Sequence, residues 1–252
     1  MRHLFNCWAT VRRRLRASPS IALFLDFDGT LAWIADRPAH ASLPATTRRI
    51  LVRLARHHGV RVCIVSARDY ASLRHLVRAP GIVCFGLYGW QNGTGLGLPQ
   101  QERDALKEAR VRVVEHVRSI PGVWVEDKGQ SFAVHYRAAA PGAAGPAGAA
   151  LRRAIDPYAD VLRVMRGKKA WDVLPLSVRG KGAAVRRELA THPASLAIYA
   201  GDDLSDESAF QAVAPKGIAI HVGARRISKA QFRLRDPGEV YDFLQKLEPE
   251  LP

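Results

Sequence analysis

The sequence predicts an α/β fold in which a parallel β-sheet forms the core and a smaller α+β domain is inserted into it. Before residue 96 and after residue 177, continuous apolar runs, typical of strands buried on both faces, alternate with stretches of helical periodicity. Between these points, apolar residues recur with period two around glycine-containing turns, which is typical of antiparallel hairpins. We therefore expect a core of residues 20–95 and 177–252, a cap of residues 96–176 and an N-terminal arm of residues 1–19.

Length and composition are those of a soluble globular protein. The chain has 252 residues, of which 48% are hydrophobic and 24% charged, and this length allows one large domain or a domain with an insertion. No apolar run approaches the ~20 residues that a membrane-spanning helix needs, so we expect no membrane partner. Residues 1–19 contain five arginines but no apolar stretch suited to a secretory signal. We expect them to form a mobile basic arm, or a short helix, that ends at Pro19, on a cytoplasmic, monomeric protein.

The net charge of +15 raises the question of nucleic-acid binding. Of the 38 basic residues, 30 are arginines, and they are spread along the chain without an aromatic-interleaved block. We therefore expect no nucleic-acid partner, but a general attraction for anionic substrates. The three cysteines, Cys7, Cys63 and Cys84, share no metal-ligand spacing and are expected to be small core residues in a reducing compartment.

The first part of the core alternates between strand and helix signals. Continuous apolar runs predict strands at residues 21–25, 60–65 and 81–85. Helical spacing of apolar residues predicts helices at residues 46–58 and 70–77. This strand–helix alternation is typical of a parallel sheet.

The cap has a different pattern. Residues 100–120 are expected to form an amphipathic helix, and residues 123–126 and 131–137 a hairpin. A loop rich in Ala, Gly and Pro is expected at residues 138–149, before a short helix at 151–155. Two further strands are predicted at residues 161–165 and 170–174. These elements predict a small antiparallel sheet with its helices on one face.

The alternating pattern of the core returns after the cap. Helices are predicted at residues 181–190, 205–213 and 239–247. Buried strands are predicted at residues 195–200 and 217–222.

The stretch that organises the chain is IALFLDFDGTL, residues 21–31, in which a buried strand ends in Asp26 and Asp28. Two carboxylates this close repel each other unless a cation or a proton lies between them. An isolated Asp-x-Asp could equally be a strand followed by a polar turn. The complete run DFDGTL, however, resembles the first motif of the haloacid dehalogenase-type phosphatases, which implies a phosphatase of that superfamily.

Four polar segments are expected to meet at one edge of the sheet, because ligands of parallel sheets gather at the carboxyl ends of the strands. They contain Asp26 with Asp28, then Ser66, then Lys181, and finally Asp202 in the run GDDLSDE. This set suits phosphoryl transfer to a carboxylate nucleophile.

We assign Asp26 as the nucleophile and Asp28 as the acid and base. Mg²⁺ is the expected cofactor, bound by Asp26, the backbone carbonyl of Asp28, and Asp202. Ser66 and Lys181 are expected to bind the phosphate oxygens.

Each segment also has a simpler interpretation. Ser66 could be a helix N-cap, Lys181 a solvated lysine, and residues 201–203 an ordinary strand-to-helix turn. The occurrence of all four in order, each at the end of an apolar run, favours the phosphatase interpretation.

Further motifs resemble those of the trehalose-6-phosphate phosphatases. They are the pair Glu126-Asp127-Lys128 and His135-Tyr136-Arg137, the run GDDLSDE at residues 201–207 followed by Phe210, Lys181-Gly182, and the segment VYDFL at residues 240–244. The resemblance covers residues 21–247 and implies a haloacid dehalogenase-like Rossmannoid core with a cap of the C2B type. It also implies hydrolysis of trehalose 6-phosphate, with Mg²⁺ as cofactor and a sugar phosphate as the small-molecule partner.

The resemblance also implies a set of substrate-binding residues. In this sequence they are Arg68, Lys128, His135, Arg137, Lys168 and Asp172. The alternative for the hairpin residues is an exposed sheet face with charged side chains.

Three departures from the family pattern fall on the sugar side of the site. Ser66-Ala67-Arg68 replaces Ser-Gly-Arg, Tyr88-Gly89-Trp90-Gln91 replaces His-Gly-x-Glu, and Asp172 stands where glutamate is usual. Another phosphorylated sugar or sugar acid is therefore an alternative substrate. An inactive, regulatory sugar-phosphate-binding module is a third possibility, which the intact acidic motifs disfavour.

Overall fold

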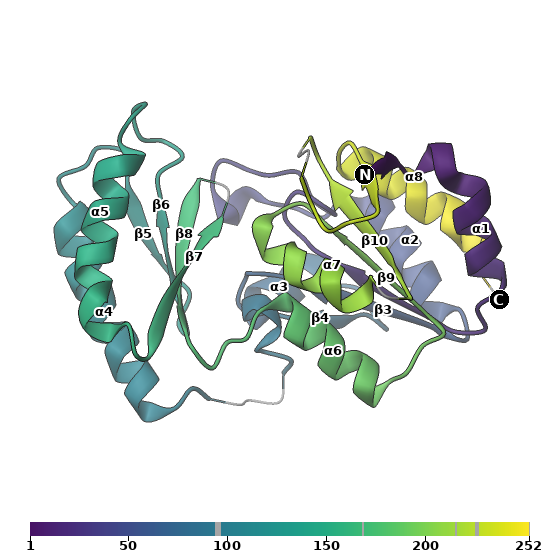
Figure 1. Ribbon diagram of the computed structural model, residues 1–252, viewed down its shortest axis with the longest axis horizontal. Coiled ribbons are helices and arrows are strands. Elements are labelled where there is room, and N and C mark those ends of the chain that lie inside the picture. Colours follow the sequence, from purple (N-terminus) through teal and green to yellow (C-terminus); the bar gives the residue numbers. More distant parts are fainter. Residues whose placement is uncertain (94–96, 168, 215, 225–226, 252) are drawn as a thin grey trace. The chain divides into compact units, whose positions relative to one another are not determined.

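The computed structural model of the chain describes residues 1–93, 97–167, 169–214, 216–224 and 227–251. The chain divides into two compact units, which we call the core unit (Met1–Gly93 and Arg179–Pro252) and the inserted unit (Thr94–Val178). The sequence placed this insertion at residues 96–176. The core unit contains a parallel sheet and the inserted unit an antiparallel one (Figure 1), so the predicted fold class is confirmed.

The sheet of the core unit has seven strands, all parallel to their neighbours, in the order β1-β11-β10-β9-β2-β3-β4. The central strand β2 (Ile21–Leu25) lies between β3 and β9. Its last residue, Leu25, pairs with Ile64 on one side and Ala200 on the other. The remaining strands are β1 (Arg2–His3), β3 (Val60–Val65), β4 (Val83–Phe85), β9 (Leu196–Gly201), β10 (Ile218–Val222) and β11 (Phe232–Leu234).

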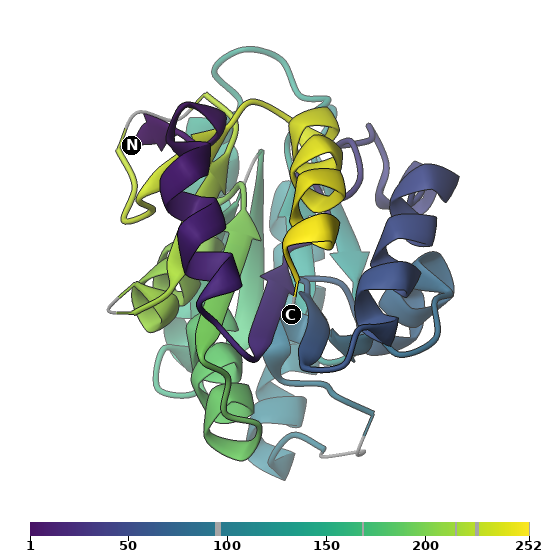
Figure 2. The ribbon, with the colours of Figure 1, turned by 90° about the vertical axis from the view of Figure 1, so that its right-hand side faces the viewer.

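Helices cover both faces of this sheet, which explains why β2 is apolar at every position. Ile21, Leu23 and Leu25 pack into one buried cluster, while Ala22 and Phe24 point into another on the opposite face. The first cluster includes side chains of α1 (Trp8–Arg16), α2 (Ala45–Arg56), α3 (Tyr70–Val77) and α8 (Pro237–Leu247). The second includes side chains of α6 (Lys181–Thr191) and α7 (Glu207–Val213). Figure 2 looks onto the first face, with α1 in purple and α8 in yellow.

Residues 1–19 do not form a mobile arm, but the alternative of a short helix is confirmed by α1. Strand β1 pairs with β11, and α1 packs on the sheet through Val11 and Leu15, which are fully buried together with Leu4. The apolar side chains at positions 4, 11 and 15 form one buried stripe, and the arginines of this segment lie outside that stripe. His3 Nε2 also bonds Glu239 Oε2 of α8 at 3.0 Å, which further fixes the N-terminus.

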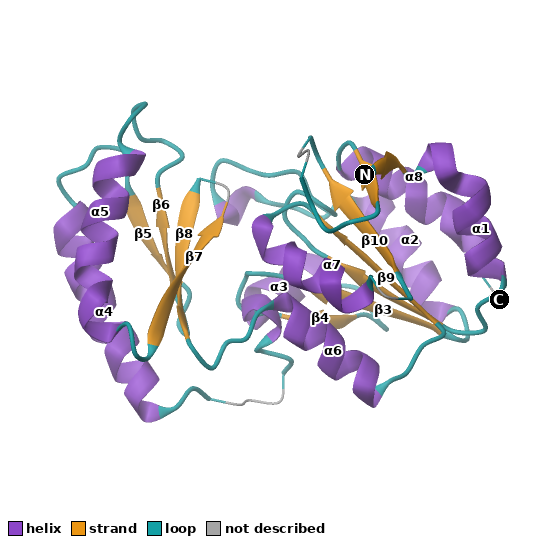
Figure 3. Cartoon of the chain, viewed as in Figure 1, coloured by secondary structure: helices purple, strands orange, loops and turns teal. Residues whose placement is uncertain are grey.

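The inserted unit has a four-stranded antiparallel sheet in the order β5-β6-β8-β7, with α4 and α5 on one face (Figure 3). Its elements are α4 (Gln100–Val117), β5 (Trp124–Asp127), β6 (Phe132–His135), α5 (Ala144–Ile155), β7 (Leu162–Gly167) and β8 (Ala170–Pro175). Phe132 and Val134 of β6 are fully buried.

One expectation for the inserted unit is wrong. Residues 144–149, expected to be loop, form the first half of α5. The small residues there let the helix approach the sheet closely, because a Cβ atom added at Gly148 would lie 3.2 Å from the Trp171 ring. Packing against the sheet therefore overrides the low helix propensity of glycine.

Two simpler expectations concern the cysteines and membranes. Cys63 and Cys84 are buried, and burial raises the pKa of the Cys63 thiol to about 12, as expected for inert core residues. No helix in the described part of the chain is long and apolar enough to cross a membrane.

Candidate active site in the core unit

Acidic side chains follow two adjacent strands of the core sheet at the same edge. Asp26 comes directly after β2, and Asp202 directly after β9. The Asp26 N–H donates to the carbonyl oxygen of Ala200 at 2.9 Å, which extends the pairing of the two strands to their ends. Both carboxylates are only 4% exposed, although each carries an ionisable group. Such burial requires compensating partners.

Lys181 supplies one of these partners. This residue begins α6, is 2% exposed, and donates from Nζ to Asp26 Oδ1 at 2.5 Å and to Asp206 Oδ1 at 2.8 Å. It is therefore not a solvated lysine. Burial raises the pKa of Asp26 well above its usual value, with Asp206 and Asp202 adding to the rise and Lys181 opposing it. An ionised Asp26 thus depends on nearby positive charge.

Asp206 is a residue of this cluster that was not among the predicted site residues. It is fully buried, and all of its acceptor capacity is used. Oδ1 accepts from Lys181 Nζ and from the Tyr199 hydroxyl at 2.6 Å, while Oδ2 accepts from the backbone N–H groups of Asp202 at 3.0 Å and Asp203 at 2.9 Å. The available signal was its place in the run GDDLSDE, four residues after Asp202, which allows its side chain to fold back on the turn.

The residues present fit a hard divalent cation. Asp26, Asp202 and Asp206 each offer a carboxylate oxygen, and these oxygens lie within 4.8 Å of one another. Because Asp206 already accepts four hydrogen bonds, Asp26 and Asp202 are the candidate ligands. The backbone beside Asp202 leaves no room for a side chain: at Gly29, where φ is +87°, a Cβ atom would lie 2.1 Å from Asp202 Oδ2.

Asp28 is held by Arg68. The guanidinium donates from Nε to Asp28 Oδ2 and from Nη2 to Asp28 Oδ1, both at 2.7 Å. Arg68 Nη2 also donates to the carbonyl oxygen of Pro38 at 2.9 Å, and the guanidinium lies 5.6 Å from the centre of the Phe27 ring. The structure thus pairs the predicted substrate-binding residue Arg68 with the predicted acid and base.

Ser66 lies at the end of β3 and is 1% exposed. It is not an N-cap, because that role belongs to Asp69, whose carboxylate accepts from the Ser72 N–H at 2.9 Å. The Ser66 hydroxyl accepts from the Arg68 N–H at 3.2 Å. Gln91 also stabilises the start of α3, since its Oε1 accepts from the Tyr70 N–H at 2.7 Å.

The candidate residues of the inserted unit share one face of its sheet. Asp172 pairs across the sheet with Ala133, which pairs in turn with Glu126, so these three side chains point to the same side. His135, two residues after Ala133, points to this side as well. It is the side opposite Trp171, whose ring contacts α5 at Gly148.

An ion pair and a hydrogen bond organise this polar face. Lys128 Nζ donates to Asp172 Oδ1 at 2.7 Å, and His135 Nε2 lies 2.7 Å from Glu126 Oε2. The His135 ring stacks on Trp124 with 4.2 Å between ring centres. Glu126, part of a motif noted in the sequence, was not among the predicted site residues.

Two predicted residues add little to this picture. Arg137 is exposed and follows β6, whereas Lys168 lies outside the described residues.

Comparison with protein families identifies relatives of the whole chain. Residues 24–237 match the family described as trehalose-phosphatase. The trehalose-phosphate phosphatase of Mycobacterium ulcerans (strain Agy99) is 36% identical over 248 residues, which are 92% of this chain and 63% of that protein. An uncharacterized glycosyl hydrolase of Mycobacterium tuberculosis is 36% identical over 257 residues, which are 95% of this chain and 19% of that protein. The chain thus spans less than two thirds of the length of these relatives.

Solved structures show the same fold. The C-terminal domain of the Candida albicans trehalose-6-phosphate phosphatase superposes with a TM-score of 0.85 at 22% identity, covering 97% of this chain and 98% of that one. A sugar phosphatase of subclass IIB of the haloacid dehalogenase superfamily superposes with a TM-score of 0.58 at 15% identity, covering 90% and 98%. The haloacid dehalogenase-like fold predicted from the sequence is confirmed.

Proposed function

Because the chain belongs to the trehalose-phosphatase family, we propose that it hydrolyses trehalose 6-phosphate to trehalose and inorganic phosphate through an aspartyl-phosphate on Asp26. The observation that carries this proposal is the buried contact between Asp26 and Lys181 at 2.5 Å, in a cluster with two further carboxylates. A structural ion pair does not need this excess of negative charge, whereas a phosphoryl-transfer site that binds a cation does.

The reaction begins with Asp26. One carboxylate oxygen of Asp26 attacks phosphorus, and the bond between phosphorus and the sugar oxygen breaks. Lys181 Nζ, bonded to both Asp26 and Asp206, keeps Asp26 ionised and oriented. Ser66 and Lys181 offer donors to the phosphate oxygens, where negative charge develops in the transition state.

Asp28 moves the protons. In its protonated form Asp28 donates a proton to the departing sugar oxygen, and the resulting carboxylate then removes a proton from the water that attacks the aspartyl-phosphate and releases Asp26. Two hydrogen bonds from Arg68 hold the ionised Asp28 carboxylate, the form that acts as the base in the second step. Arg68 is therefore a positioning residue in our proposal, in addition to its predicted contact with substrate.

Asp26 and Asp202, with the backbone carbonyl of Asp28, would hold Mg²⁺. When bound, the ion neutralises phosphate charge and orients the group for in-line attack. Asp206 orients the Asp202 backbone and pairs Lys181, which leaves the other two carboxylates available as ligands.

The polar face of the inserted unit is our candidate for the sugar-binding surface. Its Lys128–Asp172 pair is largely buried, with side-chain exposures of 13% and 8%, and a preorganised pair of this kind suits hydrogen bonding to sugar hydroxyls. His135 and Glu126 form a second pair on the same face. Arg137 and Lys168 complete the set that the family resemblance implies.

A phosphate-release assay over a panel of sugar phosphates tests this function. Trehalose 6-phosphate should have the highest kcat/KM, and Asp26→Asn should remove the activity on every substrate. If another sugar phosphate were preferred, the chemistry would stand and the substrate assignment would fail. If no substrate released phosphate in the presence of Mg²⁺, but trehalose 6-phosphate bound, the chain would be a binding module.

A further inference from the structure

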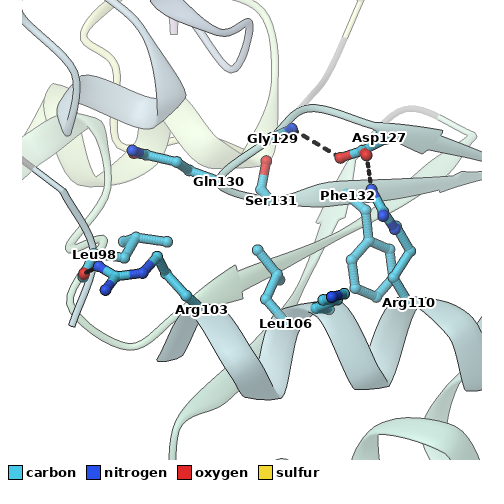
Figure 4. A pocket seen from close by; sticks show the side chains of 10 residues that line it. Leu98, Arg103, Leu106, Arg110, Asp127, Gly129, Gln130, Ser131 and Phe132 are labelled. Atoms are coloured by element: carbon cyan, nitrogen blue, oxygen red, sulfur yellow. Dashed lines mark hydrogen bonds and ion pairs between the residues drawn. The ribbon is translucent and has the colours of Figure 1, made fainter. Parts of the chain in front are cut away.

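A separate cavity lies within the inserted unit, between α4 and the turn that joins β5 to β6 (Figure 4). Its volume is about 260 Å³. Its lining residues are Leu98, Arg103, Leu106, Lys107, Arg110, Asp127, Gly129, Gln130, Ser131 and Phe132. Lys128 is not among them, since its ammonium bonds Asp172 on the face of the sheet that points away from the helices. The cavity is therefore distinct from the candidate sugar-binding face.

The charge around this cavity is positive. Arg103, Lys107 and Arg110 follow one another at helical spacing along α4, so their side chains project toward the same side of the helix. Arg110 is paired with Asp127, which leaves a local balance of three positive charges minus one, or +2. Within the described part of the chain, Arg103 donates to two neutral acceptors, the Leu98 carbonyl and the Gln100 amide oxygen.

Two other acids on this part of α4, Asp104 and Glu108, are not among the residues that line the cavity. Asp104 accepts two hydrogen bonds from Gln100 Nε2, and Glu108 accepts from the Tyr158 hydroxyl. Lys107 has no ion-pair partner among the described residues. The cavity thus keeps unneutralised cationic groups at its wall.

A buried hydroxyl in the cavity wall could bond to a ligand. Ser131 is 1% exposed, and its Oγ has no hydrogen-bond partner in the part of the chain that the structure describes. Leaving a buried hydroxyl without a partner is costly, so most such groups bond to protein, water or a ligand. The backbone around it is already satisfied, because the Ser131 carbonyl accepts from the Lys128 N–H at 2.9 Å.

We propose that this cavity is a second ligand site that binds a small phosphate monoester with a partly apolar body. A phosphate monoester carries a charge of about −1.5 to −2 near neutral pH, which matches the local balance of +2. Arginine and lysine bind its oxygens, and the Ser131 hydroxyl donates one further hydrogen bond. Leu98, Leu106 and Phe132 form an apolar wall for the rest of the molecule (Figure 4).

Phenyl phosphate is a suitable probe, titrated into the ¹⁵N-labelled full chain in EDTA so that metal-dependent hydrolysis is suppressed. Saturable shifts of the Gly129 and Ser131 amide resonances report the proposed site. The amides of Ser66 and Asp202 report the active site in the same spectra. Lys107→Ala should raise the Kd measured at Gly129 by about ten- to a hundredfold, as expected for the loss of a charge-assisted hydrogen bond.

Arg118→Ala is the matched control, because it removes one charge just beyond the end of the same helix. Position 118 lies eleven residues from Lys107, or about 16 Å along the helix axis, where salt screens the interaction. This variant should leave the Kd unchanged. The proposal would be overturned if shifts appeared only at Ser66 and Asp202, or if Arg118→Ala weakened binding as much as Lys107→Ala. Neither outcome would affect the proposed phosphatase function.

Discussion

Asp206→Asn should strongly destabilise the core unit, although the substitution changes only one atom. The carboxylate accepts two hydrogen bonds on each oxygen, from Lys181 and Tyr199 on Oδ1 and from two backbone N–H groups on Oδ2. Whichever way the asparagine amide is turned, its NH₂ group faces two donors, so two hydrogen bonds are lost. Breaking a buried charge pair costs about 3–5 kcal/mol. At about 2–4 °C per kcal/mol for a chain of this size, Tm should fall by about 6–20 °C.

The measurement is thermal unfolding followed by circular dichroism, in EDTA so that metal binding does not add to stability. Asp203→Asn is the control, because it removes the same charge from the same turn. Its carboxylate accepts from the Leu204 N–H at 2.7 Å, a capping role that asparagine fills equally well. Equal Tm values for the two variants would show that the fold does not depend on the ionised Asp206 carboxylate. The structural role assigned to Asp206 in the cluster would then be wrong.

Four further expectations follow from the same structure. Asp26→Asn should abolish phosphate release yet raise Tm in EDTA by about 2–4 °C, because it removes a carboxylate whose pKa is raised by burial. Residual turnover of a tenth of the wild-type rate would exclude Asp26 as the nucleophile. Chelation should remove activity and Mg²⁺ restore it, whereas full activity after metal stripping would refute the assigned cation site. Lys128→Ala should lower kcat/KM for trehalose 6-phosphate by about ten- to a hundredfold, but leave kcat/KM for p-nitrophenyl phosphate nearly unchanged. Equal losses on the two substrates would mean that Lys128 supports the fold instead. Burial alone would raise the pKa of Glu239, but hydrogen bonds from Arg235 and His3 lower it, so ionised Glu239 stabilises the folded state above its unfolded pKa and this stabilisation is lost as the pH falls. Glu239→Gln should therefore flatten the acid side of the profile of unfolding free energy against pH, and an unchanged profile would exclude this contribution.

The central part of the site could be predicted because its signals are local. Asp26 and Asp202 each follow a continuous apolar run, and parallel strands bring their carboxyl ends to one edge. The sequence therefore predicted that both carboxylates lie at this edge of the sheet, although it could not give the distance between them. Lys181 lies at the start of a helix that the periodicity also indicated.

Features that depend on contacts between distant segments were missed. Strand β1 has two residues and β11 three, too few to show a period, and each is fixed mainly by its pairing with a neighbour. The N-terminal arginines suggested a solvated arm, whereas the buried stripe of α1 became evident only with the sheet in place. The role of Gln91 was hidden for the same reason, since its acceptor, Oε1, bonds the backbone of a residue 21 positions earlier.

The division of labour among the three buried carboxylates explains what the proposed cation would contribute. When ionised, Asp26, Asp202 and Asp206 carry three negative charges and Lys181 one positive charge, so these four side chains by themselves sum to −2. Asp206 cannot relieve this excess by binding a metal, because its oxygens are saturated by protein donors. A divalent cation between Asp26 and Asp202 would bring the cluster to zero and lower the cost of an ionised Asp26. In the proposed mechanism, one ion would therefore both stabilise the ionised nucleophile and attract the anionic substrate.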